Sequence, residues 1–187
     1  INLIDKAVEL SPENANLVAY KGSLLISQND LEGIKALEQA LMLDPGLTDV
    51  EFSLALQYLT SGEENKAQSI AQKWIASQDN KVSGYLLQGI INTKQNNNTA
   101  AKADFMQVLA LEEKNISALY NLAIIFENEE NIEQAEDYYT QVITIMPSHE
   151  GALGRLSTLK AKNNELAENI AFLSKLSAEN PENINLF

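Results

Sequence analysis

Apolar residues recur at helical spacing through residues 116–149, ISALYNLAIIFENEENIEQAEDYYTQVITIMPSH. The first stripe occupies positions i, i+3, i+4 and i+7 and consists of Leu119, Leu122, Ala123 and Phe126. Such a stripe is typical of one face of an amphipathic helix. After the polar break ENEEN, a second stripe with the same spacing begins at Ile132. The segment therefore predicts two helices joined by a short turn, which is a helix hairpin.

The four prolines divide the chain at regular intervals. They are Pro12, Pro45, Pro147 and Pro181, and their positions rise in steps of 33, 102 and 34. Because 102 is three times 34, the prolines lie on one lattice of about 34 residues, with Asp79 and Glu113 at its two vacant positions. Proline lacks an N–H and restricts the residue before it, so a helix ends there. The lattice predicts a series of hairpins that each end at one of these junctions.

Small residues align when the sequence is shifted by one repeat. The first helices contribute Gly22, Ala55, Gly89, Ala123 and Ser157, and the second helices contribute Ala67, Ala101 and Ala135, with Asn169 in the last repeat. A small side chain lets two helix axes approach closely, so we expect the helices of each hairpin to cross at these positions. The first repeat is one residue shorter and leaves Gly33 and Ile34 on either side of the expected position, which predicts a local adjustment there.

This pattern resembles the tetratricopeptide repeat family, whose units are 34-residue helix hairpins with small residues at two helix contacts and a closing proline. Large residues also match that family, namely Tyr85 and Leu119 at the opening of the first helix, Tyr58 and Phe126 near its end, and Phe105 and Tyr139 in the second helix. The resemblance implies an all-α fold, a right-handed α-solenoid of stacked hairpins in a single domain over residues 1–187. Its five full repeats are expected at 15–47, 48–81, 82–115, 116–149 and 150–183.

Both ends of the chain read as partial repeats. Residues 1–14, INLIDKAVELSPEN, are expected to be the second helix of an earlier repeat, and residues 184–187 the opening of a later one. Departures from the family pattern are Lys21 and Gln88 in a column that is usually leucine, Asn92 and Lys160 in one that is usually aromatic, and Trp74 where alanine is usual. We expect Trp74 to be a core residue, as large aromatic side chains usually are.

The charge balance restricts the partners of the chain. A net charge of −13 disfavours nucleic acid and anionic membrane surfaces, because both require a basic face. No apolar run approaches the length of about 18 residues that a membrane-spanning helix requires, so we expect no insertion into a membrane. Cysteine is absent, which excludes disulfides and thiolate chemistry within the sequence.

Reactive groups are sparse, and we therefore expect no enzymatic activity, no cofactor and no metal. His149 is the only histidine and is predicted to lie in an exposed loop between repeats. The acidic cluster Glu127, Glu129, Glu130 and Glu133 lacks the alternating oxygen ligands and turn glycine of a calcium loop. A solvated turn is the first interpretation of this cluster, and a docking patch for a basic partner is the alternative.

In the tetratricopeptide repeat family, two columns of the first helices line a concave groove. The corresponding residues here form the candidate peptide-binding groove: Phe52, Leu56, Leu59, Leu86, Ile90, Tyr120 and Ile124. An apolar strip with polar margins is typical of a binding site for an amphipathic helix or an apolar peptide. The competing interpretation is that these residues pack against neighbouring helices and are largely buried.

The resemblance implies a non-enzymatic scaffold that binds a protein or peptide partner. The alternative is a structural arm of a larger enzyme or of a bacterial envelope assembly for polysaccharide export or protein sorting. The segments KVSGYLLQGI and AKADFMQVLALEEKN also resemble bacterial tetratricopeptide repeat lipoproteins of exopolysaccharide and PEP-CTERM protein-sorting systems. Self-association through the exposed ends or the groove is a third hypothesis. The bacterial periplasm, the cell envelope and the cytoplasm all stay open as locations.

Overall fold

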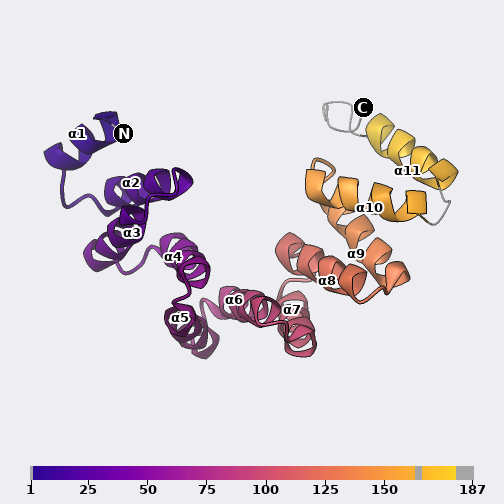
Figure 1. The fold of residues 1–187 in the computed structure, drawn as a ribbon, viewed down its shortest axis with the longest axis horizontal. Helices are drawn as coiled ribbons and strands as arrows, with labels where there is room; N and C mark the ends of the chain where they lie inside the picture. Colours follow the sequence, from indigo (N-terminus) through magenta and orange to yellow (C-terminus); the bar gives the residue numbers. More distant parts are fainter. Residues whose placement is uncertain (1, 163–165, 180–187) are drawn as a thin grey trace. The chain divides into compact units, whose positions relative to one another are not determined.

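The computed structural model describes residues 2–162 and 166–179, and all regular structure within these ranges is α-helix (Figure 1). The helices of this described part are α1 (Asn2–Leu10), α2 (Ala15–Ser27), α3 (Glu32–Leu43), α4 (Thr48–Ser61), α5 (Glu64–Ala76), α6 (Lys81–Lys94), α7 (Asn98–Leu111), α8 (Ile116–Asn128), α9 (Ile132–Ile145), α10 (Glu150–Lys162) and α11 (Leu166–Glu179). The chain divides within α6 into two compact units, Ile1–Leu87 and Gln88–Phe187, and each is described by itself. The predicted all-α fold of repeated helices is confirmed.

Helix ends follow the proline lattice. The helices α1, α3 and α9 each end two residues before a proline, at Pro12, Pro45 and Pro147 respectively. At the vacant lattice position Glu113, α7 also ends two residues earlier. The fourth proline, Pro181, lies outside the described residues. The proline junctions that the structure describes therefore end helices as the sequence predicted, while the division of the chain into one domain with five repeats stays a prediction.

The backbone conformation of the turns within the hairpins also repeats along the chain. One residue in each of four turns has a positive φ: Asn29, Gly62, Asn96 and Glu130, with φ of 59°, 85°, 59° and 59°. Successive positions are one repeat apart, so they follow the same period that the prolines gave. Glycine and asparagine adopt this left-handed conformation readily, but glutamate does so at a cost. A hairpin turn of one geometry thus recurs in both units.

Small residues sit where the two helices of a hairpin cross. Gly22, Ala55, Gly89 and Ala123 are all buried. A Cβ atom added to Gly89 would lie 2.6 Å from the ring of Phe105 on α7, far inside van der Waals contact. The predicted close approach is therefore confirmed at Gly22 and Gly89, whereas Ser157 is partly exposed and the side chain of Asn169 lies outside the described part of the chain.

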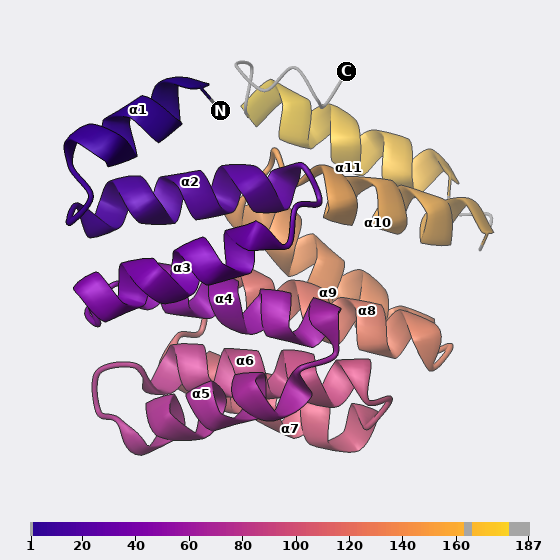
Figure 2. The same ribbon diagram turned by 60° about the vertical axis from the view of Figure 1, so that its left-hand side comes forward.

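The shorter first repeat has a contact between two glycines. A Cβ on Gly33 of α3 would lie 2.6 Å from the carbonyl oxygen of Gly22 on α2. These two helices pack closely side by side (Figure 2). The backbones of α2 and α3 are therefore in contact at this crossing, where other hairpins have an alanine or an aromatic ring. This contact is the local adjustment that we expected from the missing residue.

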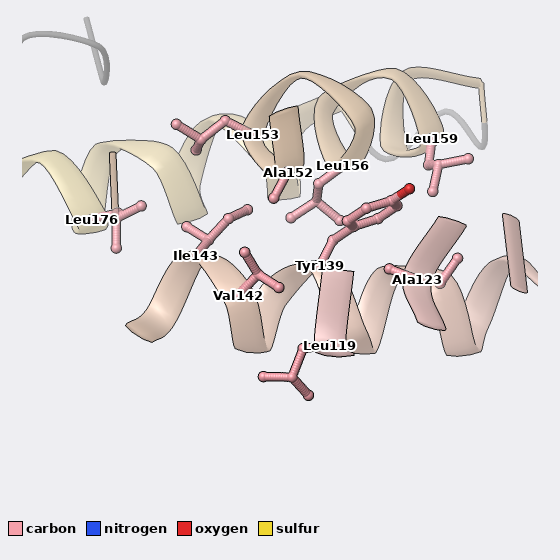
Figure 3. Close-up of a cluster of buried hydrophobic side chains, with 11 residues drawn as sticks. Leu119, Ala123, Tyr139, Val142, Ile143, Ala152, Leu153, Leu156, Leu159 and Leu176 are labelled. Atoms are coloured by element: carbon pink, nitrogen blue, oxygen red, sulfur yellow. The ribbon is translucent and has the colours of Figure 1, made fainter. Parts of the chain in front are cut away.

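The core of the second unit is continuous across its hairpins. Figure 3 shows a cluster that draws side chains from α8, α9, α10 and α11, with Leu119, Tyr139, Val142, Ile143 and Leu156 in its interior. Tyr139 is fully buried beside Leu156. Burying a side chain of this size contributes about 1.5–3 kcal/mol, so stacking of hairpins stabilises helices that would not persist alone.

Candidate partner-binding surface

The candidate groove residues lie on three first helices. Phe52, Leu56 and Leu59 are on α4, Leu86 and Ile90 are on α6, and Tyr120 and Ile124 are on α8. The unit boundary separates them into a first-unit group of Phe52, Leu56, Leu59 and Leu86 and a second-unit group of Ile90, Tyr120 and Ile124. All except Leu59 are partly exposed. Each group therefore leaves some apolar side-chain surface open to solvent.

Leu59 is different from the other six residues. Its side chain is only 4% exposed and belongs to the core of the first unit, next to the buried Tyr58. A side chain in this position contributes to hairpin packing and offers almost no surface to a partner. We therefore leave Leu59 out of the surface proposed below.

The ring of Phe52 is held in place by a buried tryptophan. Its ring stacks on Trp74 of α5 with a centroid separation of 6.0 Å and an interplanar angle of 3°. Trp74 is 1% exposed, and its indole N–H donates to Glu51 Oε2 at 3.0 Å. Lys73 also donates to this carboxylate, at 2.7 Å. The expectation that Trp74 is a core residue is confirmed, and its role is to hold Phe52 in place.

Tyr120 occupies the column of Phe52 on α8, and its ring packs against His149 and Tyr139. Its ring centroid lies 4.6 Å from that of His149 and 5.9 Å from that of Tyr139. A Cβ on Gly151 would lie 2.6 Å from the Tyr120 hydroxyl, so the glycine makes room for the ring at the start of α10. Tyr120 is thus fixed between two hairpins and keeps a partly exposed face.

His149 lies in the loop between α9 and α10 as predicted, but the expectation that it is exposed was wrong. The residue is partly buried, and its Nδ1 accepts the backbone N–H of Ala152 at 3.1 Å. This bond caps the first turn of α10, where backbone N–H groups lack partners within the helix. The sequence signal was the position of His149 directly before a helical stripe, which is where capping residues stand.

The acidic cluster lies around the turn between α8 and α9, and only part of it is a solvated turn. Glu127 Oε2 accepts the Tyr139 hydroxyl at 2.6 Å and Arg155 Nη1 at 2.9 Å. Burial, followed by the bond to Glu127, raises the pKa of Tyr139. Glu129 forms an ion pair with Lys102 of α7 at 2.6 Å. Two of the four clustered acids therefore connect neighbouring helices of the second unit.

The two polar residues in the usually aromatic column each have a polar partner. Asn92 donates to Asp104 of α7 at 2.6 Å, and Lys160 donates to Glu136 of α9 at 3.2 Å. Burial raises the pKa of Asp104. A matched partner on the facing helix thus compensates each departure from the family pattern.

Residues 2–162 and 166–179 contain no group of three or more histidine, aspartate or glutamate side chains arranged to hold a metal ion. None of the described helices combines the length and the apolarity needed to cross a membrane.

One cleft of the first unit was not predicted. It has a volume of about 390 Å³ and lies among α3, α4 and α5. Its lining includes apolar Leu41, Met42, Leu54 and Ile70 and charged Glu38, Glu51 and Lys66. The sequence held a signal in the column that contains Asp5 and Glu38, seven residues before Pro12 and Pro45. Later repeats have Gln72, Met106 and Thr140 in that column.

These stacked hairpins define an all-α helical-repeat protein. Residues 82–115 and 116–149 each match the model of the tetratricopeptide repeat. Residues 82–149 therefore match two consecutive tetratricopeptide repeats, at the bounds that the sequence pattern predicted.

Comparisons with known proteins extend this result. The chain is 24% identical over 171 residues to human Protein O-mannosyl-transferase TMTC3, a match that covers 89% of this chain and 19% of that protein. Its fold is similar to that of yeast Tom70, with a TM-score of 0.76, 20% identity and coverage of 95% of this chain and 38% of Tom70. It is also similar to YrrB, described as a TPR protein with an unusual peptide-binding site, with a TM-score of 0.52, 19% identity and coverage of 98% and 95%. The chain spans about a fifth of the human relative's length.

Proposed function

We propose that the chain is an interaction scaffold that binds an apolar peptide or amphipathic helix on the first-helix faces of its two units. The observation that carries this proposal is the packing and partial exposure of Phe52 and Tyr120. The Phe52 ring packs against Trp74, and the Tyr120 ring packs against His149. Both aromatic residues are still partly exposed. A rigid aromatic side chain loses little conformational freedom when a partner covers it, which favours binding.

The remaining members of this surface are Leu56, Leu86, Ile90 and Ile124, which are partly exposed aliphatic side chains in the same two columns. Together with the two rings they offer each unit a short apolar strip. Amphipathic helices and extended apolar peptides dock on such strips through side chains at regular intervals. The similarity to YrrB, which is described as having a peptide-binding site, supports this partner class.

Selection of peptides tests the proposal directly. Random twelve-residue peptides displayed on phage would be selected on the purified chain, and the affinity of the best binders measured by fluorescence anisotropy. Phe52→Ser and Tyr120→Ser should each weaken peptides bound to their own unit by about tenfold or more. Tyr20→Ser is the matched control, because Tyr20 is 64% exposed on α2 and lies outside both columns. Equal losses in the control, or no loss in either groove variant, would overturn the proposal.

A structural arm within a larger enzyme is the second candidate function. The match to Protein O-mannosyl-transferase TMTC3 favours it, because this chain matches 19% of a protein named as a transferase. An arm would position other parts of a longer polypeptide and would leave the first-helix faces without a free peptide partner. Failure of the peptide selection, together with loss of transferase activity when the matching segment is deleted from a longer polypeptide, would favour the arm. The resemblance to bacterial lipoproteins stays a prediction.

A further inference from the structure

The cleft among α3, α4 and α5 combines apolar walls with two carboxylates, of which Glu51 is already bound by Lys73 and Trp74. Leu41 and Met42 of α3, Leu54 of α4 and Ile70 of α5 form the walls, and Glu38 of α3 lies beside them. Met42 is 77% exposed, so its flexible side chain can adapt to a guest. The cleft opens between successive second helices, and none of the residues proposed above for peptide binding lines it.

The same cleft recurs one repeat earlier in the first unit, among α1, α2 and α3, with a volume of about 510 Å³. A shift by one repeat, from Pro12 to Pro45, places Asp5 on Glu38 and Lys21 on Leu54. In the earlier cleft, Lys21 Nζ lies 2.7 Å from Asp5 Oδ1. The chain itself thus shows that a carboxylate at this position accepts a long basic side chain that lies in the cleft.

Glu38 lacks the equivalent of Lys21, because leucine occupies that position in α4. Its Oε1 accepts the Tyr58 hydroxyl at 2.6 Å, and Lys66 Nζ lies 3.5 Å from the same oxygen. Lys66 is closer to Glu63, at 2.6 Å. Oε2 of Glu38 has no hydrogen-bond or ion-pair partner among the described residues, and the side chain is 38% exposed. One oxygen of the carboxylate therefore stays open to a donor from outside.

Both nearby lysines have an acid partner closer than Glu38. Lys35, one turn before Glu38 on α3, donates to Glu32 at 2.7 Å. Lys66 also lies over the ring of Tyr58, 4.5 Å from its centroid. Lys35 lines only the earlier cleft, and Lys66, which lines the later one, is bound to Glu63.

We propose that this cleft binds an arginine side chain that projects from an apolar segment of a partner protein. The three methylene groups of arginine would lie along Leu41, Met42 and Ile70, and the guanidinium would donate to Glu38 Oε2. Long basic side chains combine an apolar stem with a charged head in this way. Arginine fits better than lysine because its planar fork donates at fixed angles and is more weakly hydrated.

We take the partner to be another protein, because a second copy of these 187 residues would bring no free arginine. The chain contains a single arginine, Arg155, which is bound to Glu127. Residues 1–87 contain 12 aspartate and glutamate residues against 6 lysines, so a basic partner segment would be attracted to the first unit.

Short peptides provide the test. The peptide Ala-Leu-Arg-Leu-Ala, acetylated and amidated at its ends, would be titrated into the full chain by calorimetry, beside the same peptide with citrulline, the neutral isostere of arginine. We expect one bound arginine peptide per chain and an affinity about tenfold lower for citrulline. Glu38→Gln should abolish this preference, whereas Asp49→Asn, an exposed carboxylate on α4 outside the cleft, should preserve it. Equal binding of the two peptides would mean purely apolar docking and would overturn the proposal.

A gain-of-site variant gives the sharper result. Lys21→Leu installs the residue that the later cleft has at this position and frees Asp5, so the number of bound arginine peptides should rise from one to two. The substitution removes only a partly exposed ion pair and leaves the hairpin crossing intact. A stoichiometry that stays at one in a variant with an unchanged melting temperature would contradict the comparison of the two clefts. Peptide binding that survives Glu38→Gln with its arginine preference would do the same.

Discussion

Gly89 of α6 and Phe105 of α7 are in direct contact, and the ring leaves no room for a side chain at residue 89. The three ring atoms closest to an added Cβ would lie 2.6–2.8 Å away. Phe105 is fully buried, so it cannot turn outward without exposing apolar surface. This contact sets how closely the two helices of the third hairpin approach one another.

Gly89→Ala should therefore destabilise the chain by about 1–3 kcal/mol, because overpacking outweighs the gain of about 0.5–1 kcal/mol that alanine brings to a helix interior. Urea unfolding followed by circular dichroism measures this change. Gly154→Ala is the matched control, since nothing lies within 4 Å of a Cβ added to Gly154 in α10. That variant should be more stable by about 0.5–1 kcal/mol. Opposite signs support the crossing geometry, and two gains would refute it.

Glu130→Gly should stabilise the fourth hairpin turn. Glu130 has a φ of 59°, a conformation that costs a non-glycine residue about 1 kcal/mol or more and that glycine adopts freely. We expect a gain of about 0.5–1 kcal/mol in the free energy of unfolding. Gly62→Ala, at the equivalent turn with a φ of 85°, should lose a similar amount. A loss on placing glycine at residue 130 would contradict the left-handed assignment.

His149→Ala should cost about 0.5–1 kcal/mol, because the backbone N–H of Ala152 loses the Nδ1 acceptor and keeps only the backbone oxygen of His149, at 3.1 Å. His149→Asn should recover most of this loss, since asparagine is a preferred capping residue. Thermal unfolding of the three proteins at one pH distinguishes a cap from a ring contact with Tyr120. If asparagine were no better than alanine, packing against Tyr120 would be the dominant role of His149.

Two buried hydroxyls predict a loss of stability in alkaline solution. Burial, followed by a hydrogen bond to Glu38 or Glu127, raises the pKa of Tyr58 and Tyr139 in the folded state. The unfolded chain releases these protons near pH 10, whereas the folded chain retains them. Stability is therefore complete below pH 10 and falls as the pH rises further, by about 1.4 kcal/mol per pH unit for each hydroxyl.

Phenylalanine variants check this origin. Tyr139→Phe removes the bond to Glu127, so it should cost about 1 kcal/mol at neutral pH and reduce the alkaline slope. Tyr58→Phe should act in the same way in the first unit. Denaturant unfolding between pH 8 and pH 11 measures both effects. An unchanged slope in the double variant would assign the alkaline loss to other groups.

Residue spacing predicted the hairpins because helix ends and crossings depend on local properties. Pro45 ends a helix, and Gly89 permits a close crossing, whatever the rest of the chain does. Trp74 was assigned to the core for a similar reason, because a large ring in a small-residue column must be accommodated.

Side-chain contacts between helices could not be predicted from the aligned repeat positions. The bond from Arg155 to Glu127 and the burial of Leu59 depend on the angle between helices, which a linear repeat does not specify. For the same reason, the cleft beside Glu38 became visible only when α3, α4 and α5 were placed together. The column of Asp5 and Glu38 was nevertheless present in the sequence.

The contact between Gly22 and Gly33 has a consequence for protein engineering. The two backbones approach closely here, and the side chains of Leu37 and Ile26 pack directly against Gly22 and Gly33. The hairpin that carries this contact is also the one that is a residue shorter than the repeats after it. A designed repeat array that has to accept a hairpin one residue shorter could therefore copy this glycine pair together with its two packed aliphatic side chains.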